Sequence, residues 1–241
     1  MVQIRRAALA AIAIAVAVGW MLSGCGGGVV GGVTAVSTPN PGVFLPSSTP
    51  YGRTYGEWGD EWWRWALGIP AADNPIMDDT GAKAHVGQSG PVWFLAGTFG
   101  KFAERTCTVP AGKAVFFPIL NTTSWIPDAP TVAGLHAGVK SGLDPIRELE
   151  AEVDGVQLQG LFNYRFESPS SFHFTTVDLF SFWGIELAPG YTDGLENEAV
   201  SGGYYIMLEP LQAGQHTIRF RGKSISPPKY PGGDPEVFEV P

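Results

Sequence analysis

Charge is scarce in this sequence, and nucleotide-binding motifs are missing from it. Only 16% of the 241 residues are charged, and 15 basic residues stand against 23 acidic ones. The basic residues form no cluster, which argues against a nucleic-acid partner and against recognition of an anionic membrane surface by charge. The sequence also contains no Walker loop, no dinucleotide-binding glycine motif and no internal repeat.

The first 24 residues have the form of an export signal. Arg5 and Arg6 make a positive start, and residues 7–22 are an unbroken run of apolar and small residues. An uncleaved membrane helix is the alternative, because the run approaches the roughly 18–20 residues that span a bilayer. The ending Leu22-Ser-Gly-Cys25 decides between them, since it resembles the lipobox of bacterial lipoproteins. We therefore expect Cys25 to become the lipidated N-terminus, anchored to a membrane of the cell envelope on its extracytoplasmic side.

The residues after Cys25 predict a tether and then one domain. Gly26 is not the aspartate that commonly retains lipoproteins at the inner membrane, which favours the outer membrane in a Gram-negative host. Residues 25–50 are rich in glycine, serine and proline and carry no charge, so we predict a flexible linker spanning about 30 Å. The alternative is that the valines of this segment pack together with Phe44 and Leu45 as an N-terminal strand. Residues 51–241 remain for a single folded domain.

The most distinctive stretch is Thr54–Pro70, which holds four of the eight tryptophans. Thr54 and Glu57 have the spacing of a capping box, and Pro70 disfavours helical geometry at the residue before it. We predict an amphipathic helix with a buried tryptophan face, and with Asp60 and Arg64 paired on the outer face. The buried stripe comprises Tyr55, Trp58, Trp62, Trp65, Ala66 and Ile69, and the opposite face comprises Glu57, Asp60, Glu61 and Arg64.

Beyond this helix the hydrophobic pattern mostly has the period of two that strands show. The clearest unit is Glu148–Leu161, where apolar and polar residues alternate on both sides of Asp154-Gly155, a two-residue hairpin turn. A second short helix is a candidate within Leu135–Ile146. The other predicted strands are Pro91–Gly97, Arg105–Pro110, Lys113–Asn121, Ser171–Phe180, Gly203–Glu209 and His216–Gly222. Many short strands, with 32 glycines and 20 prolines for turns, predict a mainly β domain: an antiparallel β-sandwich or jelly roll with one N-terminal helix.

Four motifs together resemble a family of uncharacterised exported bacterial proteins. They are Trp58-x3-Trp62-Trp63-Arg64-Trp65, GQSGPVWFLAG at 87–97, VPAGK at 109–113 and PLQAGQHTI at 210–218. The resemblance covers Trp58 to Gly222, and its motifs are specific to the family but imply no assigned activity. Members often carry a second cysteine near Ala84 that could pair with the one matching Cys107. This chain lacks it, so the resemblance implies that the disulfide is absent here.

Neither the remaining thiol nor the histidines predict a reactive site. Cys107 is the only thiol left once Cys25 is lipidated, and no catalytic signature surrounds it. We therefore interpret Cys107 as an unreactive strand cysteine, and an intermolecular disulfide is the alternative. The histidines show no HxH or HxxxH spacing, so spacing supports no metal site, and we predict no metal and no cofactor. They are His85, His136, His173 and His216.

Acidic residues gather after the predicted helix. Asp73, Asp78 and Asp79, with Asn74 among them, form either a calcium loop or a solvated acidic loop. The glycine and the terminal glutamate of an EF-hand are missing, which favours the solvated loop.

Two tryptophans in predicted loops, Trp125 and Trp183, are the candidate ligand-binding residues. Exposed rings on the rim of a sandwich would suit sugar stacking. Glu196 and Glu198 fall in a glycine-rich predicted loop near Trp183, and two acids beside an aromatic platform are what glycoside hydrolysis needs. The leading hypothesis is a non-catalytic, lipid-anchored module that binds a glycan or protein ligand. A cell-surface glycan hydrolase and a purely structural envelope protein are the alternatives.

Overall fold

The computed structural model describes residues 2–4, 40, 42–98, 100–126, 128–178, 194–226 and 236–240. The helices are α1 Tyr55–Leu67 and α2 Val132–Leu143, with 3-10 turns at Pro50–Gly52, Ala71–Asp73 and Leu161–Tyr164. The strands are β1 Val2–Ile4, β2 Val92–Phe94, β3 Cys107–Val109, β4 Ala114–Trp125, β5 Ile146–Val153, β6 Val156–Gln157, β7 Arg165–Glu167, β8 Phe172–Thr175, β9 Glu196–Leu208, β10 Gly214–His216, β11 Ile218–Ser226 and β12 Glu236–Val240. None of these helices is long and apolar enough to cross a membrane.

The strands form two main sheets. One has the order β2-β4-β9-β7, with β8 also paired to β9, and the other has the order β12-β11-β5-β6. A small third sheet has the order β10-β1-β3. All pairs are antiparallel except β2 with β4 and β1 with β10. The predicted mainly β, largely antiparallel sandwich with a tryptophan-rich N-terminal helix is confirmed.

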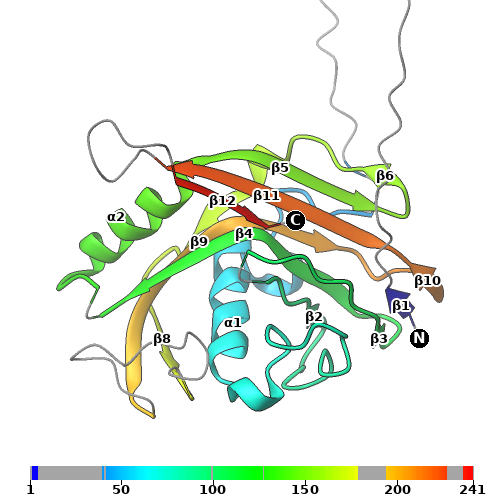
Figure 1. The fold of residues 1–241 in the computed structure, drawn as a ribbon, viewed down its shortest axis with the longest axis horizontal. Helices are drawn as coiled ribbons and strands as arrows, with labels where there is room; N and C mark the ends of the chain where they lie inside the picture. Colours follow the sequence, from blue (N-terminus) through cyan, green and yellow to red (C-terminus); the bar gives the residue numbers. More distant parts are fainter. Residues whose placement is uncertain are drawn as a thin grey trace, which may run out of the picture.

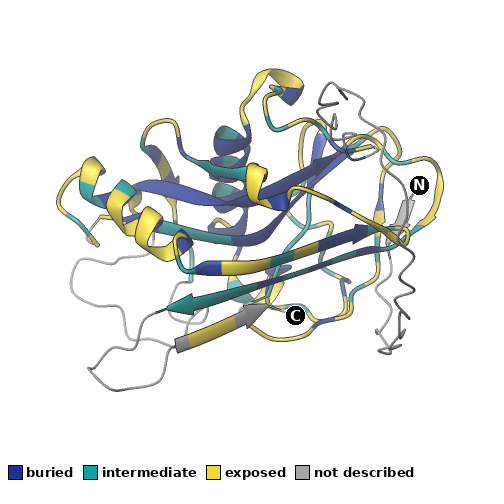
Figure 2. Ribbon diagram, turned by 90° about the horizontal axis from the view of Figure 1, so that it is seen from above, coloured by how far each residue is buried: buried dark blue, intermediate teal, exposed yellow. Residues whose placement is uncertain are grey.

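The β4–β9 sheet is the middle layer of the molecule. Helix α1 lies against one of its faces, and the β11–β5 sheet lies against the other beside α2 (Figure 1). Successive side chains of β4 and β9 point to opposite faces of the sheet, and both faces are covered. On the α1 side, Phe116 stacks on Tyr205 with ring centroids 5.3 Å apart and also contacts Tyr55. On the far side, Phe117 stacks on Phe220 at 4.9 Å. Buried residues accordingly run along the middle layer, while exposed residues lie on the outer elements (Figure 2).

The predicted hairpin is present between β5 and β6. Asp154 and Gly155 both have positive φ, 52° and 82°, as a type I′ turn requires. The acidic face of β5 points outward and forms a ladder of ion pairs with β11. The two pairs made by the exposed Glu148 and Glu150 contribute under about 1 kcal/mol each, whereas Glu152 of the third pair is buried. The pairs are Glu148–Lys223, Glu150–Arg221 and Glu152–Arg219.

Helix α1 begins and packs as its sequence predicts. Thr54 and Glu57 form the capping box, with the Glu57 carboxylate 2.7 Å from the Thr54 backbone nitrogen. Three buried indoles of the stripe each donate a hydrogen bond to a carbonyl of a different loop. The bonds are Trp58 to Pro50 at 2.9 Å, Trp62 to Leu95 at 3.0 Å and Trp65 to Val86 at 2.9 Å.

One guanidinium organises the long irregular segment 74–106. Apart from β2, the described residues of this segment form no helix or strand. Arg105 donates to the backbone carbonyls of Asp78 at 2.6 Å, Ala96 at 2.8 Å, Gly97 at 2.9 Å and Ile76 at 3.0 Å. Four carbonyls that lack partners in regular structure are thereby satisfied from one side chain.

The folded part begins upstream of Tyr51. Val43 is buried and forms an isolated β-bridge with Leu208, and the backbone N–H of Phe44 donates to the Met207 carbonyl at 3.0 Å. The end of the predicted linker therefore packs on the edge of β9.

Candidate functional site

Asp60 is the side chain whose position the sequence least predicts. It was expected on the outer face of α1 in a pair with Arg64, and that expectation is wrong. Asp60 is 5% exposed, and its Oδ1 accepts hydrogen bonds from Ser168 Oγ at 2.5 Å and Ser201 Oγ at 2.7 Å. Arg64 bonds Glu61 at 2.8 Å instead.

Two glycines of α1 explain why Asp60 is buried. A Cβ on Gly59 would lie 2.8 Å from ring atoms of Tyr205, and one on Gly56 would lie 2.2 Å from the backbone oxygen of Glu167. Without side chains at these positions the helix backbone approaches β9 and β7 closely. The flank of the helix that carries Asp60 therefore faces the sheet rather than water.

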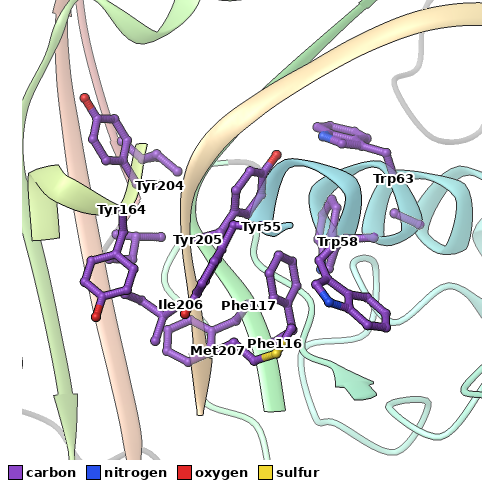
Figure 3. Close-up of a cluster of buried hydrophobic side chains, with 14 of the residues drawn as sticks. Tyr55, Trp58, Trp63, Phe116, Phe117, Tyr164, Tyr204, Tyr205, Ile206 and Met207 are labelled. Carbon is purple, nitrogen blue, oxygen red and sulfur yellow. The ribbon is translucent and has the colours of Figure 1, made fainter. Parts of the chain in front are cut away.

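Three buried polar side chains from α1, β4 and β9 lie together at Tyr205 beside the buried carboxylate of Asp60. Among the described residues, Tyr205 Oη, Trp63 Nε1 and Asn121 Nδ2 are buried atoms with no hydrogen bond of normal geometry. The Tyr205 hydroxyl and the Trp63 indole nitrogen point toward one another (Figure 3). Burial raises the pKa of Tyr205 well above its ordinary value, and side-chain hydrogen bonds with Ser201, Trp63 and Asn121 partly offset the effect of burial and of the nearby Asp60 charge. The Tyr205 hydroxyl is therefore the acceptor that lies nearest to the Trp63 indole and the Asn121 amide.

A cavity of about 80 Å³ adjoins this group. Trp63 and Asn121 line it, together with apolar side chains of α1, β4 and β12. Phe238 of β12 also lines it and is 48% exposed, so the cavity reaches the surface.

A second cavity, of about 70 Å³, shares Gly97 and Thr98 with the first. Its other lining side chains include Leu95, Cys107 and Phe220, and it is mainly apolar. The two cavities thus meet at the segment Gly97–Thr98.

The prediction that Trp125 is an exposed loop residue is wrong. It is the last residue of β4, is 7% exposed and packs edge-to-face on Phe174 with centroids 5.7 Å apart. Strand β4 continues this far because it pairs with the N-terminal half of β9, where Trp125 lies opposite Ala199. The other predicted site residues, Trp183 and Cys25, lie outside the described residues.

Glu196 and Glu198 lie on strand β9 and not in a loop, contrary to prediction. Glu198 accepts a hydrogen bond from Ser171 Oγ at 2.6 Å. That hydrogen bond ties the residue before β8 to strand β9.

Polar side chains of the acidic segment after α1 form hydrogen bonds with other groups of the protein. The Asn74 amide donates to the last carbonyls of the helix region, Ala66 at 2.7 Å and Ile69 at 2.9 Å. Burial alone would raise the pKa of Asp78, but hydrogen bonds from the backbone of Lys83 and from Thr80 lower it to about 2. No group of three histidine, cysteine or acidic side chains suited to a metal occurs within the described ranges.

Cys107 has the properties of an unreactive thiol. Burial raises its pKa to about 11, and the charge of Arg105 offsets this only in part. His85 lines a surface cavity with Cys107, but its Nδ1 is 3.0 Å from the Ala82 carbonyl oxygen. Ala84 lines both cavities that Cys107 lines, so a cysteine at that position would lie near Cys107.

Comparison with protein-family models, curated proteins and solved structures finds no match for this chain.

The burial of Asp60 predicts a dependence of stability on pH. Burial raises its pKa to about 6 despite the hydrogen bonds from Ser168 and Ser201. Because the folded pKa exceeds the unfolded value, protonation of Asp60 stabilises the fold most below about pH 4, and this contribution is lost as the pH rises through 6. Between pH 4 and pH 7, titration of Asp60 should lower the free energy of unfolding of the parent by about 2–3 kcal/mol. Chemical denaturation at the two pH values should show that Asp60→Asn lacks this decrease.

The control for that measurement is Asp73→Asn, which removes a carboxylate from an exposed position. It should leave the pH dependence of the parent unchanged. Equal pH dependence in the parent and in Asp60→Asn would contradict the burial of the charge.

Proposed function

We propose that this chain is a lipid-anchored, extracytoplasmic and non-catalytic module that binds a small apolar ligand. The observation that carries the proposal is the pair of apolar cavities that meet at Gly97–Thr98, one of which opens past Phe238. Ligand sites are usually concave, mainly apolar and provided with a few polar groups. The lipobox at Cys25 supports the anchor.

An apolar ligand fits this geometry better than a glycan does. Sugar stacking needs an exposed ring, and of the two tryptophans predicted for it Trp125 is buried against Phe174, while Trp183 lies outside the described residues. The side chains whose chemistry could serve catalysis are assigned no catalytic role in this proposal. Asp60 accepts hydrogen bonds from two serines, Glu198 accepts one from Ser171, and the Cys107 thiol is protonated at neutral pH.

Binding is tested on the mature chain carrying Cys25→Ala, with the fluorescent apolar probe N-phenyl-1-naphthylamine. We expect saturable enhancement of probe fluorescence. Gly97→Leu should reduce the affinity at least tenfold, because residue 97 lines both cavities and a Cβ there meets nothing within 4 Å. Ser170→Leu adds the same side chain at an exposed position and should bind like the parent. Equal affinity for the parent and Gly97→Leu would refute binding in these cavities.

The anchor is tested in the same series by mass spectrometry and cell fractionation. The parent chain should carry acyl mass and sediment with membranes, and Cys25→Ala should lose both properties. Acylation that persists without Cys25 would rule out the proposed anchor.

A further inference from the structure

Strand β1 lies between two strands that pair with no other strand among the described residues. It pairs antiparallel with β3 on one side and parallel with β10 on the other, and the three lie together at one end of the molecule (Figure 1). Neighbouring strands lie about 4.8 Å apart, so β3 and β10 stand roughly 10 Å apart and admit one strand between them. We call this gap, bounded by Cys107–Val109 and Gly214–His216, the strand slot.

The strand that occupies the slot belongs to a part of the chain that we expect maturation to remove. Residues 2–4 lie within the export signal, which ends before Cys25. Cleavage there would take β1 away and expose the facing edges of both neighbours. A sheet edge presents a row of unpaired N–H and C=O groups and is a template for a further strand. The strand slot presents two such edges to one incoming segment.

Contacts that do not involve β1 hold both walls of the slot. Beside β10, Asp154 of the hairpin turn accepts from the backbone N–H of Thr217 at 2.8 Å and lies 2.6 Å from His216 Nδ1. Beside β3, the backbone N–H of Thr106 donates to the Thr80 carbonyl at 2.9 Å. We therefore expect the slot to keep its shape without β1, so that an incoming strand need not order its walls.

Register and burial select the side chains of such a strand. The antiparallel register places residue 2 opposite Val109, residue 3 opposite Thr108 and residue 4 opposite Cys107. Val109 is buried and Cys107 is half-buried, whereas Thr108 is exposed, as is Gln215 beside residue 3 on β10. Residues directly opposite one another in a sheet have their side chains on the same face. The first and third residues of the strand therefore face inward and favour apolar side chains, and the middle one faces water.

We propose that the strand slot of the mature chain binds an extended segment of a partner protein, which becomes the middle strand between β3 and β10. The segment runs parallel to β10 and antiparallel to β3, and it reads apolar-polar-apolar over its three paired residues. Backbone hydrogen bonds to two edges supply affinity, and the two inward side chains supply specificity. This surface is separate from the apolar cavities of the proposed function, and the inference rests only on removal of the signal.

The chain's own tether is the competing occupant, because it also contains valines. It is part of the same molecule, yet residues 2–4 are the ones that pair with β3 and β10. A segment from outside the mature chain therefore fits the slot better than the tether does.

The test adds labelled peptides to the mature chain carrying Cys25→Ala, which lacks β1. The probe is the pentapeptide of residues 2–6, and fluorescence polarisation measures its binding. We expect saturable binding that is at least about tenfold weaker for the Gln3→Pro peptide, because every N–H of a middle strand faces one of its neighbours and proline has none. The Gln3→Ser peptide keeps the backbone donors and the charge, and it should bind like the parent peptide.

Cys107 reports the register, since it is the only thiol of that chain. An Ile4→Cys peptide places its thiol opposite Cys107, where the two Cβ atoms of a directly opposite pair are about 4.5–5.5 Å apart. Oxidation with diamide should therefore join this peptide to Cys107, as measured by intact-protein mass spectrometry. The Gln3→Cys peptide carries its thiol on the other face and should give at least about tenfold less of the joined product.

The outcomes separate this inference from the proposed function. Equal binding of the parent and Gln3→Pro peptides, or equal joining of the two cysteine peptides to Cys107, would overturn the slot. If the parent peptide binds only after residues 26–39 are deleted, the tether fills the slot and a partner segment is refuted. If it binds neither chain, the slot is not a binding site. Binding of N-phenyl-1-naphthylamine and acylation of Cys25 are measured independently, so either proposal can fail alone.

Discussion

Replacing Arg105 with alanine is expected to lower the free energy of unfolding by at least about 4 kcal/mol. The guanidinium holds four backbone carbonyls between 2.6 and 3.0 Å, and its loss leaves them without a donor. Hydrogen bonds to a charged group contribute about 1.5–3 kcal/mol each, although four bonds from one side chain do not add fully. Chemical denaturation measures the loss, and limited proteolysis should locate new cleavage within 74–106.

Two further substitutions separate geometry from charge. Arg105→Lys keeps the charge but replaces a planar fork of donors with a single ammonium, so it should recover little of the lost stability. Arg53→Ala removes an exposed arginine that pairs with Glu61 at 2.6 Å and should cost under about 1 kcal/mol. If Arg105→Ala and Arg53→Ala are equally stable, the guanidinium does not organise the segment.

Gly56→Ala is expected to destabilise the domain by at least about 3 kcal/mol, although alanine is the better helix former. Helix propensity alone predicts a gain of about 1 kcal/mol. At this position, however, the added Cβ would lie 2.2 Å from the Glu167 carbonyl oxygen. The helix or β7 would have to move, and overpacking against backbone is costly. Thermal and chemical denaturation both measure the effect.

Gly138→Ala is the matched control because Gly138 lies in the second helix, α2. Its Cβ would meet the Ser124 hydroxyl at 3.1 Å, and a hydroxyl can rotate away. We expect a change between zero and a gain of about 1 kcal/mol. A Gly56→Ala protein as stable as the Gly138→Ala protein would contradict the close packing of α1 on the sheet.

Local signals in the sequence were sufficient for α1 and for the hairpin. The capping box of Thr54 and Glu57 and the turn at Asp154-Gly155 depend on residues within a few positions of one another. The tryptophan stripe follows from helical spacing, and its burial is confirmed. The cap, the helical spacing and the turn each depend only on residues that are close together in the sequence.

The candidate site could not be predicted because it depends on tertiary contacts. Helical spacing places Asp60 among the polar residues of α1, and only the glycine-mediated approach to β9 buries it. Strand β9 runs from Glu196 to Leu208 and is buried on both faces over most of its length, so its sequence does not alternate. Strand β4 extends to Trp125 because it pairs with the N-terminal half of β9, which the sequence pattern does not reveal.

The three indole hydrogen bonds of α1 have a consequence for the breathing motions of the folded protein. Trp58, Trp62 and Trp65 each tie a different loop to the same helix face. While α1 stays packed on the sheet, these hydrogen bonds restrict the motion of all three loops. When α1 separates from the sheet, the three hydrogen bonds break together. Amide hydrogens around Pro50, Val86 and Leu95 should therefore exchange with solvent as one group, at the rate set by separation of α1 from the sheet.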